Sequence, residues 1–122
     1  MLGQRDDVPF LLSAMDIGVM ASDQEGLSNA VLEKLASGLP VVATDIGGNA
    51  EALEGMPGCV LVRAHDPDDL ARGISSVIQH LALDRGREAR QKLARDRYSV
   101  ASMVDAYKQL YGSACPASPR PT

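Results

Sequence analysis

The sequence predicts an α/β fold in which an incomplete parallel sheet of about three to four strands is flanked by helices. Short apolar runs rich in β-branched residues alternate along the chain with stretches whose apolar residues recur at helical spacing. Glycine or proline separates most of these runs. This alternation is typical of strand–helix–strand units, which build parallel sheets. A doubly wound sheet usually has about five or six strands, so we expect part of the domain to be missing.

The first two predicted elements are short. A helix over 8–14 follows Asp7, whose carboxylate can accept a hydrogen bond from a free amide of the first helical turn. The run D-I-G-V-M at 16–20 is apolar and short enough to be a buried strand.

A longer helix is predicted over 28–37. Leu27, Val31 and Leu35 recur every four residues and form the stripe expected to face the core. Gly38 is the expected end of this helix, because glycine readily adopts the left-handed conformation that closes many helices.

Two further strands are predicted at 40–44 and 58–62, which read P-V-V-A-T and G-C-V-L-V. The turn D-I-G-G-N and a short helix over 49–54 separate them. After the second of these strands, Asp66 and Pro67 predict the start of another helix. Aspartate is a good N-cap, and proline is tolerated at the first helical position.

The last part of the chain is predicted to be helical. The helix that follows Asp66 carries its apolar residues on one face, namely Leu70, Ile74, Val77, Ile78 and Leu81. Two more helices are expected over about 84–97 and 101–111, the second with Met103, Val104, Tyr107 and Leu110 at helical spacing. We therefore assign 1–111 to one partial domain, and 112–122, with its three prolines, to a disordered tail.

Composition argues against several function classes. The chain has 122 residues, and its longest stretches without charge, such as 35–44, are about half the ~20 residues of a membrane span. Four aromatic residues and no Trp argue against a stacking platform for nucleic acid. The first residues lack the order of a secretory signal, and two cysteines make no disulfide framework. We expect a cytoplasmic protein that binds no nucleic acid.

Charge is unevenly distributed along the chain. Residues 1–84 carry 13 acidic and 4 basic side chains, whereas 85–122 carry 3 acidic and 8 basic ones. Most of the basic side chains lie in the run R-G-R-E-A-R-Q-K-L-A-R-D-R at 85–97. Such a run can mark a nucleic-acid or acidic-lipid surface. The interleaved Glu88 and Asp96 favour a solvated helix face, which is the interpretation adopted here.

The segment after the first strand carries the candidate site. It reads A-S-D-Q-E-G-L-S-N-A-V-L-E, with seven residues between Glu25 and Glu33. Ligands of open parallel sheets bind at the carboxyl ends of the strands, and the start of a helix favours a phosphate. Asn29 and Glu33 share one helix face, where a carboxylate can accept hydrogen bonds from the vicinal hydroxyls of a ribose. On spacing alone, both glutamates are also consistent with solvated surface carboxylates.

A wider pattern extends this motif. The segments E-G-L-S-N-A-V-L-E and K-L-A-S-G-L-P-V-V-A-T-D-I-G-G-N-A-E follow one another, and Y-S-V-A-S-M-V-D-A-Y-K-Q-L-Y comes near the end. Together they resemble the carboxy-terminal half of the retaining glycosyltransferases of family 4, which have the GT-B fold. The resemblance covers residues 2 to about 111. It implies a Rossmann-like half of a GT-B carboxy-terminal domain.

The resemblance implies roles for the matched positions. Glu25 corresponds to the glutamate that lies against the donor sugar and contributes to catalysis. The implied donor-binding residues are Glu33, for the ribose hydroxyls, with Gly26, Leu27, Ser28 and Asn29. Gly3, Gln4 and Arg5 resemble the loop that lines the nucleotide base. Gly47 and Gly48 match the family's Gly-Gly turn and are interpreted as a tight turn, with Asp45 and Glu51 as turn and helix-start residues. No metal or cofactor is expected, and His65 and His80 are interpreted as surface histidines.

The implied function is transfer of a sugar from a nucleotide-sugar donor to an unknown acceptor. A diphosphate leaving group needs cations or N–H donors, yet 6–33 contain no Lys or Arg. In the family an upstream Arg and Lys supply them, and an amino-terminal domain binds the acceptor. We therefore expect a fragment that is inactive alone and binds nucleotide weakly, from a parent that associates peripherally with a membrane. One alternative is a non-catalytic Rossmann-like interaction or regulatory module. Another is a different GT-B enzyme, such as a sugar-nucleotide epimerase or a phosphorylase. The phosphorylase is disfavoured because the motif has no nearby pyridoxal-phosphate lysine.

Overall fold

The computed structural model of the chain describes residues 3–24 and 26–114. Within these residues three short strands form one parallel sheet in the order β1-β2-β3. The strands are β1 (Gly18–Met20), β2 (Val41–Thr44) and β3 (Val60–Val62). The α-helices are α1 (Val8–Ser13), α2 (Asn29–Ala36), α3 (Asn49–Leu53), α4 (Pro67–His80), α5 (Arg87–Tyr98) and α6 (Val100–Ala114), and a 3₁₀ turn, η1 (Leu81–Leu83), follows α4.

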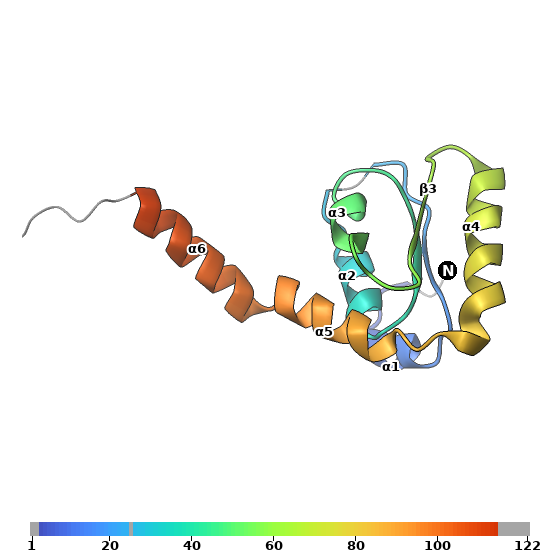
Figure 1. Ribbon diagram of the computed structural model, residues 1–122, viewed down its shortest axis with the longest axis horizontal. Helices are drawn as coiled ribbons and strands as arrows, with labels where there is room; N and C mark the ends of the chain where they lie inside the picture. Colours follow the sequence, from blue (N-terminus) through green and yellow to red (C-terminus); the bar gives the residue numbers. More distant parts are fainter. Residues whose placement is uncertain (1–2, 25, 115–122) are drawn as a thin grey trace, which may run out of the picture.

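The sheet is covered by helices on both faces (Figure 1). All four residues of the central strand β2 are buried. On one face, Val41 and Ala43 pack with side chains of α2 and α3, including the fully buried Val31 and Leu35. On the other face, Val42 packs against α4. The residues of β2 alternate between the two faces, as a strand of a covered parallel sheet does.

The predicted alternation of strands and helices is confirmed, with most bounds shifted by one or two residues. Gly38 closes α2 with φ +82°, as expected. The carboxylate of Asp66 accepts the Asp69 amide at 2.9 Å, which confirms this cap of α4. Asp7 does precede α1, but its carboxylate makes no cap bond, because both of its oxygens accept from Arg5.

Two apolar positions predicted to face the core do not lie there. Leu27 precedes α2 and is 47% exposed, because the chain has not yet turned into the helix at this point. Ile78 is 55% exposed, since the buried face of α4 is centred on Gly73 and Val77. The apolar stripes of α2 and α4 therefore bury fewer residues than their sequence spacing suggests.

The basic run forms α5, as predicted, but its face is not wholly solvated. Arg90 is 1% exposed, which corrects the interpretation of this run as a solvated surface. The helix packs against α2, and Ala94 joins the core beside Arg90. A side chain that is charged but buried needs internal partners, and these are described below.

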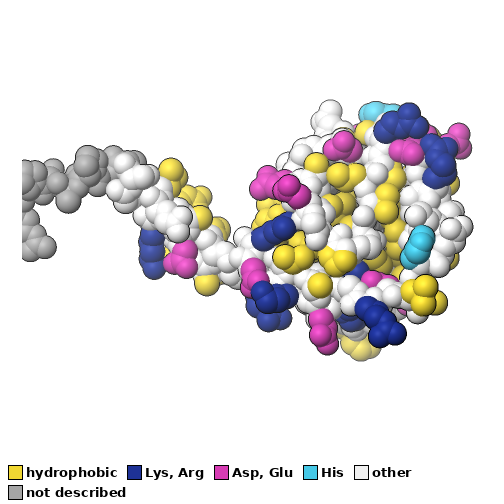
Figure 2. Space-filling model, viewed as in Figure 1, with side chains coloured by type: hydrophobic (Ala, Val, Ile, Leu, Met, Phe, Trp, Pro, Cys, Tyr) yellow, Lys and Arg dark blue, Asp and Glu magenta, His cyan; other side chains and the backbone are white. Residues whose placement is uncertain are grey.

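The last helix, α6, leads away from the sheet (Figure 1). It continues to Ala114, so 112–114 are helical and the predicted start of the tail at 112 is wrong. The remainder of that tail, 115–122, lies outside the described residues. The helix leaves large apolar side chains exposed, including Val100, Tyr107 and Leu110, and apolar groups are visible along it in Figure 2. Within the described residues no helix combines the length and apolarity needed to cross a bilayer.

Candidate functional site

The candidate site lies where the three parallel strands end. The loops that follow β1, β2 and β3 meet at this carboxyl edge and are joined by hydrogen bonds. The Thr44 hydroxyl donates to the carbonyl of Ser22 at 2.7 Å, and the Asp45 amide donates to the carbonyl of Val62 at 2.7 Å. The fully buried Asn49 donates through Nδ2 to the carbonyl of Thr44 at 2.9 Å. These bonds fix the loops relative to the sheet.

The Gly-Gly turn packs directly on the predicted donor loop. The Gly48 amide donates to the carbonyl of Gly26 at 3.2 Å. A Cβ atom at Gly48 would lie 3.0 Å from the Cα of Leu27, so this position needs a residue without a side chain. Gly47 has φ +49°, which is the left-handed conformation of a tight turn. The turn interpretation is thus correct, and Gly48 additionally sets the position of Leu27.

The amino end of α2 is open next to this contact. Ser28 is the N-cap residue and is buried, and its side chain makes no cap hydrogen bond. Within the described residues, the first amide that bonds back into the helix is that of Val31, so the amides before it are available to a ligand. Gly26 is exposed, and a Cβ there would meet no atom within 4 Å. A negatively charged group could therefore approach the backbone closely at this point.

Asn29 and Glu33 lie on the exposed face of α2, opposite the buried Val31 and Leu35, as predicted. Glu33 borders a hollow of about 320 Å³ whose other side is formed by Val8 and Leu12. In the described part of the chain Glu33 has no ion pair. Its carboxylate is therefore free to bind a ligand.

Lys34, the neighbour of Glu33, packs against β1. The aliphatic part of the lysine packs over Gly18, where a Cβ would lie 2.6 Å from Lys34 Cδ. Its Nζ donates to the carbonyl of Ala30 at 3.2 Å. Burial lowers the pKa of Lys34, and the charge of Glu33 opposes this shift. The lysine thus stabilises the packing of α2 on β1.

The remaining predicted residues are placed only in part. Glu25 lies outside the described residues, so its catalytic role stays a prediction. Gly3, Gln4 and Arg5 are exposed. The guanidinium of Arg5 donates to both carboxylate oxygens of Asp7, at 2.6 and 2.5 Å, and this pair raises the pKa of Arg5 and lowers that of Asp7. A role of this loop in base binding also stays a prediction.

A group of charged side chains at the same edge was missed by the sequence analysis. A second hollow, of about 330 Å³, is bordered by Asp23, Thr44, Arg63 and His65. Arg63 Nη2 lies 2.9 Å from the Asp66 carboxylate, and His65 Nδ1 lies 3.5 Å from that of Asp23. Both basic residues directly follow β3, and this position on a parallel strand was the signal that could have found them.

The two histidines are exposed, as expected. Among the residues that the structure describes, no group of three or more His, Cys, Asp or Glu side chains could hold a metal ion. The arrangement therefore consists of an open helix end, a free glutamate one turn further along the same helix, and two hollows beside them.

Comparison with known proteins identifies the family. The family description "Glycosyl transferases group 1" matches residues 1–80. The chain belongs to this family of glycosyltransferases. The Escherichia coli enzyme UDP-Gal:alpha-D-GlcNAc-diphosphoundecaprenol alpha-1,3-galactosyltransferase is 30% identical over 112 residues. The lipopolysaccharide core biosynthesis glycosyltransferase LpsE of Rhizobium meliloti is 32% identical over 112 residues.

Two solved structures share the fold of this glycosyltransferase chain. Anabaena Alr3699/HepE, in a complex with UDP, has a TM-score of 0.79 and 26% identity over 92% of the chain. A glycosyltransferase of Rickettsia africae has a TM-score of 0.81 over 94% of the chain at 23% identity. The expected fold class, part of a GT-B glycosyltransferase, is confirmed.

The comparisons also show how much of such a protein the chain represents. It spans 29% and 33% of the two curated relatives, and 31% of each of the two solved structures. The glycosyltransferase chain thus corresponds to about a third of the length of the proteins it matches.

Proposed function

We propose that this chain forms the donor half of the active site of a retaining family 4 glycosyltransferase, which transfers a sugar from a nucleotide-sugar donor to an acceptor. The observation that carries the proposal is the open amino end of α2 beside the exposed Gly26, with the free carboxylate of Glu33 on the same helix. The complexes of Anabaena Alr3699/HepE with UDP and UDP-glucose support this class of donor.

The proposed roles follow from chemistry. The diphosphate lies against the backbone of Gly26, Leu27 and Ser28, where amides and the helix dipole favour negative charge. Glu33 accepts hydrogen bonds from the ribose hydroxyls. Glu25 lies against the donor sugar. In the reaction the bond between the anomeric carbon and the diphosphate oxygen breaks, and the nucleoside diphosphate leaves with its electron pair. The oxygen of an acceptor hydroxyl bonds to that carbon with retention of configuration, and the hydroxyl proton passes to the departing diphosphate.

The proposal includes a second domain that completes the site. The leaving diphosphate carries about two negative charges, whereas a helix end offers roughly half a positive charge. Arg63, at the same edge, is already paired with Asp66 and Asp69. Further cations therefore come from an upstream part of the same domain, and the acceptor site comes from an amino-terminal domain, as the greater length of the relatives supports. The chain alone is then inactive, and the reaction of its parent needs no metal or cofactor. The parent acts in the cytoplasm and associates peripherally with a membrane.

Calorimetry with UDP, GDP and their sugars tests the proposal on the isolated chain. We expect weak binding of a nucleoside diphosphate and no turnover. Micromolar affinity together with turnover would overturn the proposed need for a second domain. Absence of binding at millimolar nucleotide would count against the donor site itself.

Kinetics of the complete enzyme test the residue roles. Glu33→Ala should raise the KM for the donor, because it removes a ground-state contact with the ribose, and Glu25→Ala should chiefly lower kcat. Glu88→Ala, an exposed position on α5, is the matched control. Unchanged kinetics in both site variants would reject the assignment.

A further inference from the structure

A larger hollow, of about 550 Å³, opens at the opposite edge of the sheet, where β2 and β3 begin. Its wall is mainly apolar and comes from the starts of these strands, the end of α4, η1 and the start of α5, with Pro40, Cys59, Val60, Val77, Leu81 and Ala89. Pockets that hold small molecules have this size, with a mostly apolar wall and a few polar groups. The donor-site proposal makes no use of this edge.

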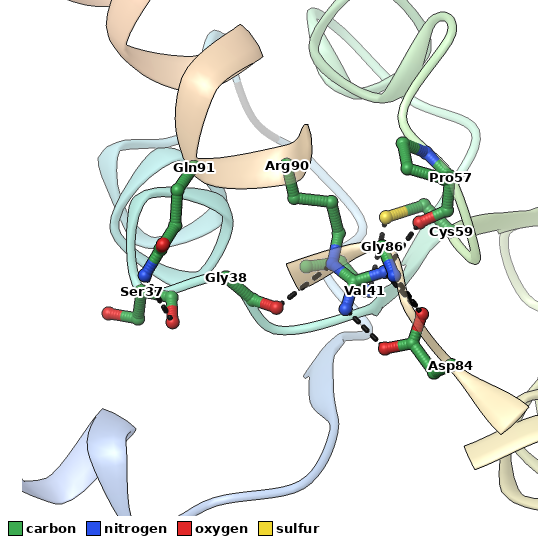
Figure 3. Close-up of polar contacts among 9 residues, drawn as sticks. All are labelled: Ser37, Gly38, Val41, Pro57, Cys59, Asp84, Gly86, Arg90 and Gln91. Carbon is green, nitrogen blue, oxygen red and sulfur yellow. Dashed lines mark hydrogen bonds and ion pairs between the residues drawn. The ribbon is translucent and has the colours of Figure 1, made fainter. Parts of the chain in front are cut away.

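The wall of this amino-edge pocket is held in place by Arg90 (Figure 3). Its guanidinium donates to the carbonyls of Gly38 at 2.9 Å and Pro57 at 2.8 Å. It also pairs with both carboxylate oxygens of Asp84, one of them at 3.0 Å. Asp84 in turn accepts the Gly86 amide at 2.9 Å. The pocket is therefore preformed, which lowers the entropic cost of binding a ligand.

The polar groups at the pocket favour an anion. Arg85 borders the pocket and is exposed, and within the described ranges it has no ion pair. The nearby carboxylate of Asp84 is neutralised by Arg90. Burial raises the pKa of the Cys59 thiol, so this group adds no negative charge near neutral pH.

We propose that the amino-edge pocket binds a small amphiphile with an apolar chain and a single anionic head group. The chain lies against Val60, Val77 and Leu81, and the head group lies at Arg85. Leu83, which is 78% exposed beside the opening, covers part of the chain. Such a ligand would occupy the end of the sheet remote from the nucleotide, so the two sites would fill independently.

Titration of the isotope-labelled chain with decanoate, followed by amide chemical shifts below the critical micelle concentration, tests this proposal. We expect saturable shifts around the pocket. Ser76→Trp places an indole at the pocket wall and should abolish them. Ser75→Trp, the next residue on α4, does not border the pocket and should leave them unchanged. Loss of binding in both variants, or in neither, would overturn the proposal.

The head group is tested separately. Arg85→Gln should weaken binding of decanoate about threefold and leave binding of decanol unchanged, since an exposed charge pair contributes little. Arg95→Gln, an exposed position on α5, is the control. Equal loss of decanoate affinity in both variants would overturn the role of Arg85.

A vesicle experiment distinguishes a free amphiphile from a lipid in a bilayer. We expect the chain not to sediment with vesicles of phosphatidylglycerol. If wild type and Ser76→Trp sediment equally with vesicles and free decanoate causes no shifts, the chain binds a membrane surface and the pocket proposal is overturned. A saturating nucleoside diphosphate should leave the decanoate shifts intact. If the chain binds decanoate but no nucleotide, the pocket proposal holds although the donor-site proposal fails.

Discussion

Arg90 and Asp84 form a two-bond ion pair across the turn that leads into α5, and Arg90 is 1% exposed. The pair does not stand alone, because the same guanidinium also donates to the carbonyls of Gly38 and Pro57. One side chain therefore joins the end of α2, the loop before β3 and the start of α5. These three segments are far apart in the sequence.

Arg90→Ala should destabilise the fold strongly. The substitution leaves the buried carbonyl of Gly38 and the half-buried carbonyl of Pro57 without this donor, and Asp84 without its cation. We therefore expect a loss of about 3 kcal/mol in the free energy of unfolding. Urea unfolding followed by circular dichroism measures it. Arg95→Ala, on the exposed face of the same helix, should change the free energy by less than about 0.5 kcal/mol. Equal effects of the two variants would contradict the structural role of Arg90.

The same pair predicts a dependence of stability on pH. The hydrogen bonds from Arg90 hold the pKa of Asp84 below its ordinary value of 3.8. A carboxyl group with a lower pKa in the folded chain stabilises the fold above its unfolded pKa. That contribution is lost as the pH falls through the folded pKa. We therefore expect stability to decrease below about pH 4.

Acid titration of unfolding checks this dependence. Asp84→Asn should be less stable at neutral pH, and its stability should decline less steeply in acid. Asp96→Asn, which removes an exposed partner of Lys92, should retain the wild-type slope. An unchanged slope in Asp84→Asn would show that another group controls the acid transition.

Gly73 is a position where a methyl group cannot fit. A Cβ there would lie 2.6 Å from Cγ1 of Val62 and 3.1 Å from Cγ1 of Val42, since α4 packs closely on the sheet at this point. Gly73→Ala should therefore cost about 1–3 kcal/mol despite the better helix propensity of alanine. Gly112→Ala, on α6 with nothing within 4 Å, is the matched control and should not destabilise. Thermal unfolding of both variants shows whether crowding at Gly73 outweighs the better helix propensity of alanine.

Gly26→Ala separates binding from folding. Because a Cβ at Gly26 meets no atom within 4 Å among the described residues other than its chain neighbours, the melting temperature should not change. If the diphosphate approaches this backbone, the added methyl group should weaken binding of UDP about fivefold, a loss of about 1 kcal/mol. Calorimetry at high nucleotide concentration measures the affinity. Full affinity in Gly26→Ala would place the diphosphate elsewhere.

Much of the fold could be predicted from the sequence because its elements have strong local signals. The run at 40–44 is β-branched and apolar, and it is the fully buried central strand. Val31 and Leu35 recur at helical spacing and are both fully buried. Asp66 and Pro67 start α4 as predicted. Each of these signals lies within a few neighbouring residues.

Features that depend on distant contacts could not be predicted in this way. Arg90 lies in a run of similar charges, and nothing local distinguishes it from the exposed Arg95. Gly73 has no visible role until α4 lies on the sheet. At the candidate site, by contrast, helical spacing alone predicted that Asn29 and Glu33 share one face of the helix. Arg63 and His65 follow the predicted strand at 58–62, so their edge could have been predicted, but their pairing with Asp66 and Asp23 could not.

The two edges of the sheet differ in how firmly their segments are joined. At the amino edge, a buried guanidinium bonds to three segments at once. At the carboxyl edge, within the described residues, the loop after β1 is joined to the sheet and to the Gly-Gly turn by neutral hydrogen bonds, from the Thr44 hydroxyl to the carbonyl of Ser22 at 2.7 Å and from the Gly48 amide to the carbonyl of Gly26 at 3.2 Å. Exchange of residues 21–28 with the corresponding loop of a relative should consequently leave the remainder intact, provided that Gly48 is kept. The fold thus separates the part that can diversify from the part that cannot.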